Sequence, residues 1–118
     1  MSKIGLGIIT CNREDFYTKC CASIPKNGID SLISINDGKP YDKPPSRGAY
    51  LQHEQNKGVG ISKNKALQYL LEQGCEHIFL IEDDIIVKNA DLKDGMLIVN
   101  LERVIPDEKK PRLIPIGQ

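Results

Sequence analysis

The sequence predicts a small α/β domain with a largely parallel sheet flanked by helices, followed by a C-terminal strand and an extended tail. Three observations predict this fold class. Short apolar runs of strand length alternate with helical patterns, polar side chains stand at the ends of the apolar runs, and glycines or prolines separate the elements. The 118 residues suit one small domain with a single core.

The first strand is expected at residues 4–9, an apolar run in which Gly5 and Gly7 allow close backbone approach. A helix is expected next, because Asn12 is a suitable cap and two acidic residues follow in the first turn. The apolar positions of this helix recur every four residues, at Phe16, Cys20 and Ile24.

A second strand is expected at residues 32–35, where Asn36, Asp37 and Gly38 then turn the chain. Residues 39–48 contain three prolines among polar side chains and predict a surface loop. A brief strand is expected at residues 49–53.

The second helix is predicted over residues 61–73, with Gly74 as its terminator. Its apolar face is expected to consist of Ala66, Leu67, Leu70 and Leu71. A glycine-containing turn precedes this helix, and lysines 57, 63 and 65 stand near its start. Such a helix N-terminus can hold phosphate, although lysines on an amphipathic helix also form ordinary solvated faces.

The third buried strand, residues 78–81, ends in Glu82, Asp83 and Asp84. Adjacent carboxylates repel one another, and a hard divalent cation that also binds phosphate oxygens offsets such repulsion. Open α/β sheets bind ligands at the carboxyl ends of their strands. The alternative is a solvated acidic turn between two short strands.

Residues 4–87 resemble the nucleotide-sugar-binding half of the GT-A-fold glycosyltransferases, in particular the inverting enzymes of family 2. The matching segments follow one another at the strand ends in the family's order. They are Thr10, Cys11, Asn12 and Arg13, then Asn36, Asp37 and Gly38, then residues 56–64, and finally Glu82, Asp83 and Asp84.

This resemblance implies a Rossmann-like fold and binding of a nucleotide-diphospho-sugar, with a UDP-sugar favoured. The implied nucleotide-binding residues are Thr10, Asn12, Asp37, Lys57, Gly58, Lys63 and Asp83. Asp84 is implied to hold Mn²⁺ or Mg²⁺ on the diphosphate, with Glu82 in place of the usual first aspartate. The cation would stabilise the charge that develops on the leaving group.

Sugar transfer also requires a general base on the acceptor hydroxyl. In the resembled family this base lies in a later segment, together with the acceptor-binding half, and Asp91 and Asp94 match no family motif. We therefore expect donor binding by a catalytically incomplete chain whose catalytic residues are unknown.

Residues 88–118 resemble instead the C-terminal end of a bacterial small heat-shock protein. The segments 90–97, 101–106 and 109–116 carry this resemblance. It implies that Ile114 and Ile116 insert into a groove on a neighbouring subunit by strand-edge recognition. Alternating apolar residues from Met96 to Leu101 predict a half-buried strand that pairs with the chain's own sheet or with a second copy, giving a homodimer.

The two resemblances lead to two hypotheses. The first is a glycosyltransferase-like donor-binding layer at residues 1–87, joined to a strand and tail at residues 88–118. The second is a chimeric or assembly module without enzymatic activity, whose chaperone-like tail mediates oligomerisation. A natural glycosyltransferase relative with an ordinary final strand is the alternative to a chimera.

Composition narrows the partners and the location. Sixteen basic residues balance sixteen acidic ones, which gives no overall field that favours nucleic acid or an anionic membrane. No stretch reaches a membrane-spanning length. The four cysteines have no Cys-x-x-Cys spacing and no apolar signal segment precedes the first strand, so free thiols in the cytoplasm are expected. His53 and His77 are interpreted as structural or surface residues.

Overall fold

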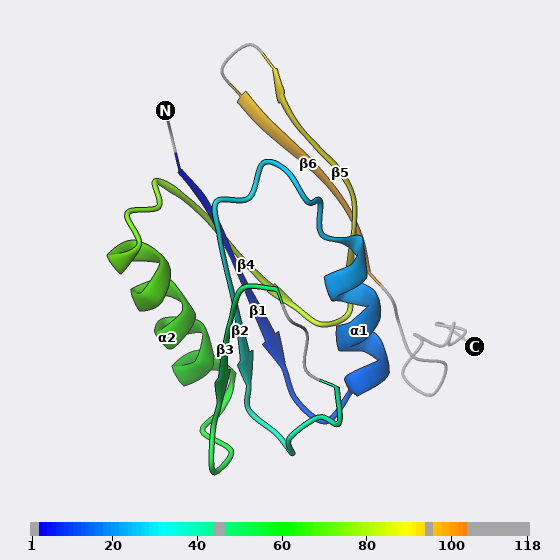
Figure 1. The fold of residues 1–118 in the computed structure, drawn as a ribbon, viewed down its shortest axis with the longest axis vertical. Coiled ribbons are helices and arrows are strands. Elements are labelled where there is room, and N and C mark those ends of the chain that lie inside the picture. The colour runs from blue at the N-terminus through cyan, green and yellow to red at the C-terminus, as the bar shows by residue number, and fades with distance from the viewer. Residues whose placement is uncertain (1–2, 44–46, 94–95, 104–118) are drawn as a thin grey trace, which may run out of the picture.

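The computed structural model describes residues 3–43, 47–93 and 96–103 and shows a mixed α/β fold (Figure 1). This confirms the expected α/β class with a parallel sheet, and the described residues contain two helices. The elements in chain order are β1 (Ile4–Thr10), α1 (Glu14–Ser23), β2 (Ser31–Asn36), β3 (Ala49–Gln52), α2 (Val59–Glu72), β4 (His77–Glu82), β5 (Ile85–Lys93) and β6 (Met96–Arg103).

Four strands form a parallel sheet in the order β3-β2-β1-β4. The strand β1 pairs with β2 on one side and with β4 on the other. Parallel neighbours need long crossover connections, and α1 and α2 lie in two of them. Because all four strands of this sheet are parallel, their carboxyl ends lie at the same edge.

The two helices cover opposite faces of this sheet (Figure 1). Because side chains alternate along a strand, Leu6 and Ile8 of β1 join the core of α1, whereas Ile9 joins that of α2. The α1 core also contains Tyr17, Cys20, Ile24, Leu32 and Ile81, and the α2 core contains Ile33, Ile35, Ala66, Leu70 and Cys75.

The β1 glycines allow α2 to approach the sheet closely, as predicted. A Cβ atom on Gly5 would lie 2.7 Å from the Sγ atom of Cys75, and one on Gly7 would lie 3.0 Å from the Cβ atom of Ala66. Such contacts are shorter than van der Waals packing permits, so a side chain at either position would displace its neighbours.

The apolar face of α1 differs from the predicted one by a single position. Tyr17, rather than Phe16, is buried beside Cys20 and Ile24. The Tyr17 hydroxyl donates a hydrogen bond of 2.7 Å to Ser34 Oγ on β2, which satisfies its polar atom inside the core. Phe16 is half-buried, with the Arg13 guanidinium 5.2 Å from its ring centroid.

The predicted capping role of Asn12 is also wrong. The N-cap residue of α1 is Arg13, and no side chain caps the helix. Asn12 instead adopts a φ of 55°. Its Oδ1 atom accepts a hydrogen bond of 2.8 Å from the backbone N–H of Lys39, so the side chain fastens a loop rather than a helix end.

Helix α2 begins two residues before the predicted start and buries a narrower face. Ala66 and Leu70 are fully buried, but Leu71 is 58 % exposed. The third member of the buried row is Ser62, whose hydroxyl donates a hydrogen bond of 2.9 Å to the Gly58 carbonyl oxygen. The apolar pattern wrongly included Leu71 in the buried face. It also missed Ser62, a small polar residue that can be buried because its hydroxyl bonds to the backbone of the same helix.

Strands β5 and β6 form a separate antiparallel sheet, which we call the β5–β6 arm (Figure 1). The predicted strand from Met96 therefore pairs with β5 and not with the parallel sheet. At the root of the arm, the Val87 N–H donates a hydrogen bond of 3.0 Å to Ser23 Oγ on α1. Ile85 and Val87 pack against the α1 core.

The predicted boundary between residues 87 and 88 lies within β5. The β5–β6 register is interrupted between Val87 and Asn89, so a bulge or similar irregularity falls at this point. The predicted tail anchors, Ile114 and Ile116, lie outside the residues that the structure describes.

The cysteines are free thiols, as expected. Cys20 and Cys75 are buried core residues. Burial raises the pKa of Cys20 to about 12 and also raises the pKa of Cys21, so neither thiol ionises near neutral pH. Among the described residues, no helix is both long and apolar enough to cross a membrane.

Candidate functional site

The carboxyl ends of three parallel strands bring the predicted polar residues to one edge of the sheet. The Asp37 N–H donates to the Thr10 carbonyl oxygen at 2.9 Å, and the Asp83 N–H donates to the Ile9 carbonyl oxygen at 3.1 Å. These bonds continue the pairing of β1 with β2 and β4 beyond the strands. The backbones of Asp37 and Asp83 therefore flank the end of β1.

Asp83 lies in a buried polar cluster with residues of β1 and the start of α1. Its Oδ2 atom accepts a hydrogen bond of 2.8 Å from the Thr10 hydroxyl, and its Oδ1 atom forms an ion pair with the Arg13 guanidinium. The Tyr41 hydroxyl accepts a hydrogen bond of 3.1 Å from the Arg13 backbone N–H. Burial raises the pKa of Asp83, although Thr10 and Arg13 oppose that rise.

Asp84 forms an ion pair with the β5–β6 arm. Its Oδ2 atom lies 2.7 Å from Nε of Arg103, the last residue of β6, and the Asp84 side chain is 8 % exposed. The Asp84 carboxylate raises the pKa of Arg103 by hydrogen bonding and charge attraction. An arginine from the small-heat-shock-like segment thus neutralises an aspartate of the acidic triplet.

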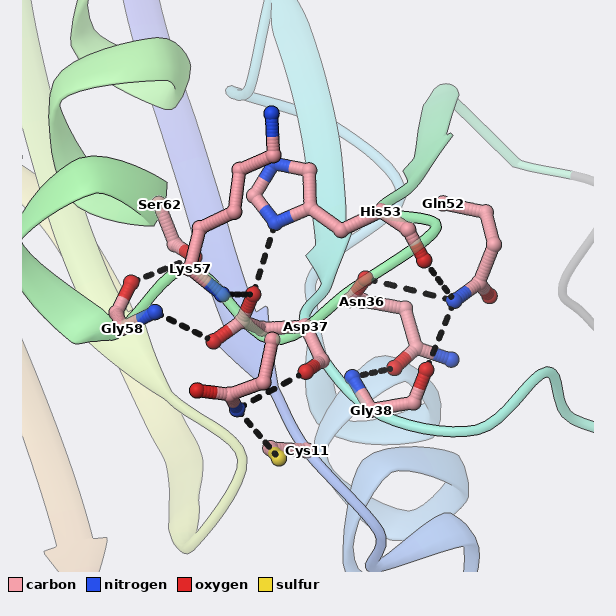
Figure 2. A network of polar contacts seen from close by, with 10 residues as sticks. Cys11, Asn36, Asp37, Gly38, Gln52, His53, Lys57, Gly58 and Ser62 are labelled. Atoms are coloured by element: carbon pink, nitrogen blue, oxygen red, sulfur yellow. Dashed lines mark hydrogen bonds and ion pairs between the residues drawn. The ribbon is translucent and has the colours of Figure 1, made fainter.

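Asp37 organises a second cluster at the start of α2 (Figure 2). Its carboxylate accepts hydrogen bonds from the backbone N–H groups of Lys57 at 2.8 Å and Gly58 at 2.9 Å, and from His53 Nδ1 at 2.7 Å. The helix has no side-chain cap of its own, so Asp37 satisfies these two amides from the neighbouring strand.

Charge and hydrogen bonding hold Asp37 ionised. Burial raises the pKa of its carboxyl group, but the Lys57 and Gly58 amides and the His53 ring outweigh that effect and keep the pKa below its ordinary value of 3.8. Gly58 has a φ of 94°, a conformation that favours glycine and that aims its N–H at the carboxylate.

A polar frame supports this cluster from the β2–β3 side (Figure 2). Asn36 Oδ1 accepts a hydrogen bond of 2.9 Å from the Gly38 N–H. Gln52 Nε2 donates to the carbonyl oxygens of Gly38 at 2.8 Å and His53 at 3.0 Å. Both strand ends next to Asp37 are therefore fixed by side chains.

The predicted nucleotide-binding residues lie in two separate clusters and at two further positions. Thr10 and Asp83 share one cluster, whereas Asp37 and the backbones of Lys57 and Gly58 share the other. Asn12 is exposed, and its side chain bonds to the Lys39 backbone. Lys63 lies on α2 with a half-buried side chain. Nucleotide binding by these residues stays a prediction.

The metal-binding interpretation of the acidic triplet is corrected. Asp83 and Asp84 direct their carboxylates to Arg13 and Arg103, so guanidinium groups offset the repulsion that a metal ion was expected to offset. The described residues contain no group of three or more His, Cys, Asp or Glu side chains that could hold a metal ion. The expected Mn²⁺ or Mg²⁺ itself stays a prediction.

Sequence reasoning missed several residues that build the site. His53, Tyr41 and Arg103 contact residues 16 to 31 positions away in the sequence. No local pattern connects such pairs. The sequence offers one general signal, because a buried aspartate requires a hydrogen-bond or charge partner. This requirement does not show which residue the partner is.

We expect Asp84→Asn to loosen the β5–β6 arm at its root, because the uncharged amide loses the ion pair with Arg103. Amide hydrogen exchange in Ile85–Lys93 should become several-fold faster. Lys88→Gln is the matched control, since it removes the exposed ion pair with Glu102 on the same arm and exposed pairs contribute little. Equal exchange in both variants would contradict an anchoring role for Asp84.

Comparisons with known proteins find relatives named small heat shock protein IbpA. The protein of Escherichia coli (strain K12 / DH10B) is 41% identical over 65 residues, which cover 52% of this chain and 47% of the relative. That of Pectobacterium carotovorum subsp. carotovorum (strain PC1) is 37% identical over 59 residues, which cover 50% of this chain and 43% of the relative. The chain spans less than half the length of these curated relatives.

No protein-family model matches the chain, and no solved structure matches it. The prediction of a glycosyltransferase is therefore wrong: the relatives found are named small heat shock proteins, and no finding supports a GT-A fold or a sugar-nucleotide donor. The resemblance to small heat shock proteins is supported over about half of the chain.

Proposed function

We propose that this chain is an assembly module of the small-heat-shock type. In this proposal the β5–β6 arm and the tail with Ile114 and Ile116 bind other protein chains, and the parallel sheet carries the arm. The observation that carries the proposal is the identity of 37% to 41% with small heat shock proteins over about half of the chain.

The geometry of the arm supports this function. A two-stranded sheet standing alone is marginally stable in water, and its outer edges present unpaired backbone groups. Strands β5 and β6 pair only with each other in the described structure. Leu101, near the end of β6, is 48% exposed. A further strand from a partner chain would cover both the edge and this apolar surface.

The root of the arm supports an assembly role for the whole chain. Arg103 bonds to Asp84, Val87 bonds to Ser23, and Ile85 packs against the α1 core. These contacts fix the direction of the arm relative to the parallel sheet. A fixed arm loses less conformational freedom when it binds than a free peptide does.

The test is the mass of the particles in solution. Light scattering should show the full chain as a dimer or larger species, and deletion of residues 109–118 should lower the mass or cause aggregation. The double substitution Ile114→Ala with Ile116→Ala should reproduce the effect of the deletion, because it removes the side chains that would enter a partner's groove. A second measurement follows the aggregation of a heat-unfolded client enzyme by light scattering. The full chain should suppress this aggregation.

The matched control is Lys109→Ala with Lys110→Ala, which changes the same tail without altering its apolar anchors. This variant should assemble and suppress aggregation as the parent does. A parent chain that is monomeric at all concentrations and has no effect on the client would contradict the proposal. So would full activity in the Ile114 and Ile116 double variant.

A further inference from the structure

A cavity of about 400 Å³ lies beside His53, between the end of β3 and α2. Its polar lining comes from His53 and the residues around it and from two lysines. These side chains are Gln52, His53, Glu54, Gln55, Lys57 and Lys65. Of these only Lys57 belongs to the predicted nucleotide-binding set.

His53 lines this cavity and carries a ring nitrogen without a hydrogen-bond partner among the described residues. The side chain is 3% exposed, and its Nε2 atom is buried without a hydrogen-bond partner among the described residues. Figure 2 shows this second ring nitrogen turned away from Asp37. A buried polar atom without a partner is destabilising, so a ligand that pairs with His53 Nε2 gains a favourable contact there.

The other ring nitrogen of His53, Nδ1, forms a hydrogen bond with Asp37. Nδ1 lies 2.7 Å from the Asp37 carboxylate, which is ionised near neutral pH and can only accept, so Nδ1 carries a proton. Nε2 is then either a bare acceptor in the neutral ring or an N–H donor in the cationic ring. A ligand that suits both forms must be able to offer a hydroxyl as well as an anionic oxygen.

We propose that this cavity binds a phosphate group. Hydrogen phosphate and phosphate monoesters present anionic oxygens to the ammonium groups of Lys57 and Lys65. A P–OH group can donate to a bare Nε2, and a P–O⁻ oxygen can accept from a protonated one. Sulfate and ionised carboxylates lack the hydroxyl, so they suit only the cationic ring. Glu54 lies in the same cavity, and its charge opposes the anion.

The test uses the two histidines of the chain in one NMR experiment. Inorganic phosphate is titrated into the intact protein while the ring Cε1–H signals of His53 and His77 are followed. The His53 signal should shift and saturate. The His77 signal should stay nearly constant, because His77 is exposed on β4 and lines no part of this cavity. Phenyl phosphate, titrated in parallel, distinguishes a site for esters from one for free phosphate.

Substitutions of charged residues test whether the phosphate binds in this cavity. Lys65→Gln should weaken phosphate binding about 10-fold, because it removes one charge-assisted hydrogen bond. Glu54→Gln should tighten binding several-fold. Lys19→Gln is the control: it removes the same charge from an exposed position on α1 and does not line the cavity, so it should leave binding unchanged.

All of these substitutions are at surface or half-buried positions and leave the buried cluster intact. Failure of the His53 signal to saturate, or a parallel shift of His77, would overturn the proposal. Equal effects of Lys19→Gln and Lys65→Gln would also overturn it, and His53 Nε2 would then hold a water molecule only. The proposal does not depend on assembly through the arm.

Discussion

Replacing Leu70 with alanine is expected to lower the free energy of unfolding by about 2–5 kcal/mol, because it leaves a cavity in a closely packed core. The Leu70 side chain is fully buried between α2 and the sheet. Its terminal carbon would lie 2.9 Å from a Cβ atom on Gly5, which shows how tightly β1 and α2 meet. Chemical denaturation followed by circular dichroism measures the change.

Leu71→Ala is the control for this effect. The two leucines are neighbours on α2, and the substitution removes the same atoms, but Leu71 is 58 % exposed. Its loss should change the free energy of unfolding by less than about 1 kcal/mol. Similar losses from both substitutions would contradict the position of α2 on the sheet. The chain is small, so a loss near the upper limit for Leu70 would leave little folded protein.

Replacing Asp37 with asparagine is expected to destabilise the fold by about 2–3 kcal/mol near neutral pH. The carboxylate accepts three hydrogen bonds, from two backbone amides and from His53. An uncharged amide carries one acceptor oxygen and cannot satisfy all three donors. The start of α2 and the end of β3 would both lose their connection to β2.

The pH dependence of this loss has a definite sign. Because the pKa of Asp37 is lowered from 3.8, the folded state favours the ionised carboxyl group, and its stabilisation is present above about pH 3.8. The stabilisation is lost as the pH falls through the pKa of the folded state. The difference in stability between parent and Asp37→Asn should therefore narrow below pH 3.8.

The difference, rather than the parent curve, is the quantity to measure, because burial raises the pKa of Asp83 and gives that group the opposite pH dependence. Asp42→Asn is the control: Asp42 is exposed in the loop after β2, so its substitution should change stability by about 0.5 kcal/mol or less. A difference between parent and Asp37→Asn that is constant from pH 7 to pH 3 would show that the Asp37 charge does not stabilise the cluster.

Local patterns predicted the strands and both helices because each depends on residues that are close in the sequence. The apolar runs located β1, β2 and β4 to within one or two residues, and the glycines of β1 marked a real close approach. The choice between Phe16 and Tyr17 was beyond such patterns. Both recur at helical spacing with Cys20 and Ile24, and the partners that Tyr17 finds in the core, including the Ser34 hydroxyl on β2, are distant in the sequence.

The chemistry of the strand ends could not be predicted in the same way. A buried carboxylate can be neutralised by a metal ion, by an arginine, or by backbone amides, and the sequence of the acidic triplet is compatible with each of these. The choice depends on Arg13 and Arg103, which reach Asp83 and Asp84 from other elements. A resemblance based on residue type and order therefore suggested a metal where the fold supplies guanidinium groups.

The strand order has a consequence for how this chain folds during synthesis. The β1 strand emerges before β2 and β4, yet one of its two partners is β4, which begins at His77. Until that segment has been translated, β1 can pair only with β2, and its other edge is open to any strand nearby. Contacts of such long sequence separation form slowly. A ribosome that pauses before His77 would therefore hold an intermediate that is prone to aggregate, and a chaperone would have its greatest effect on this protein at that stage.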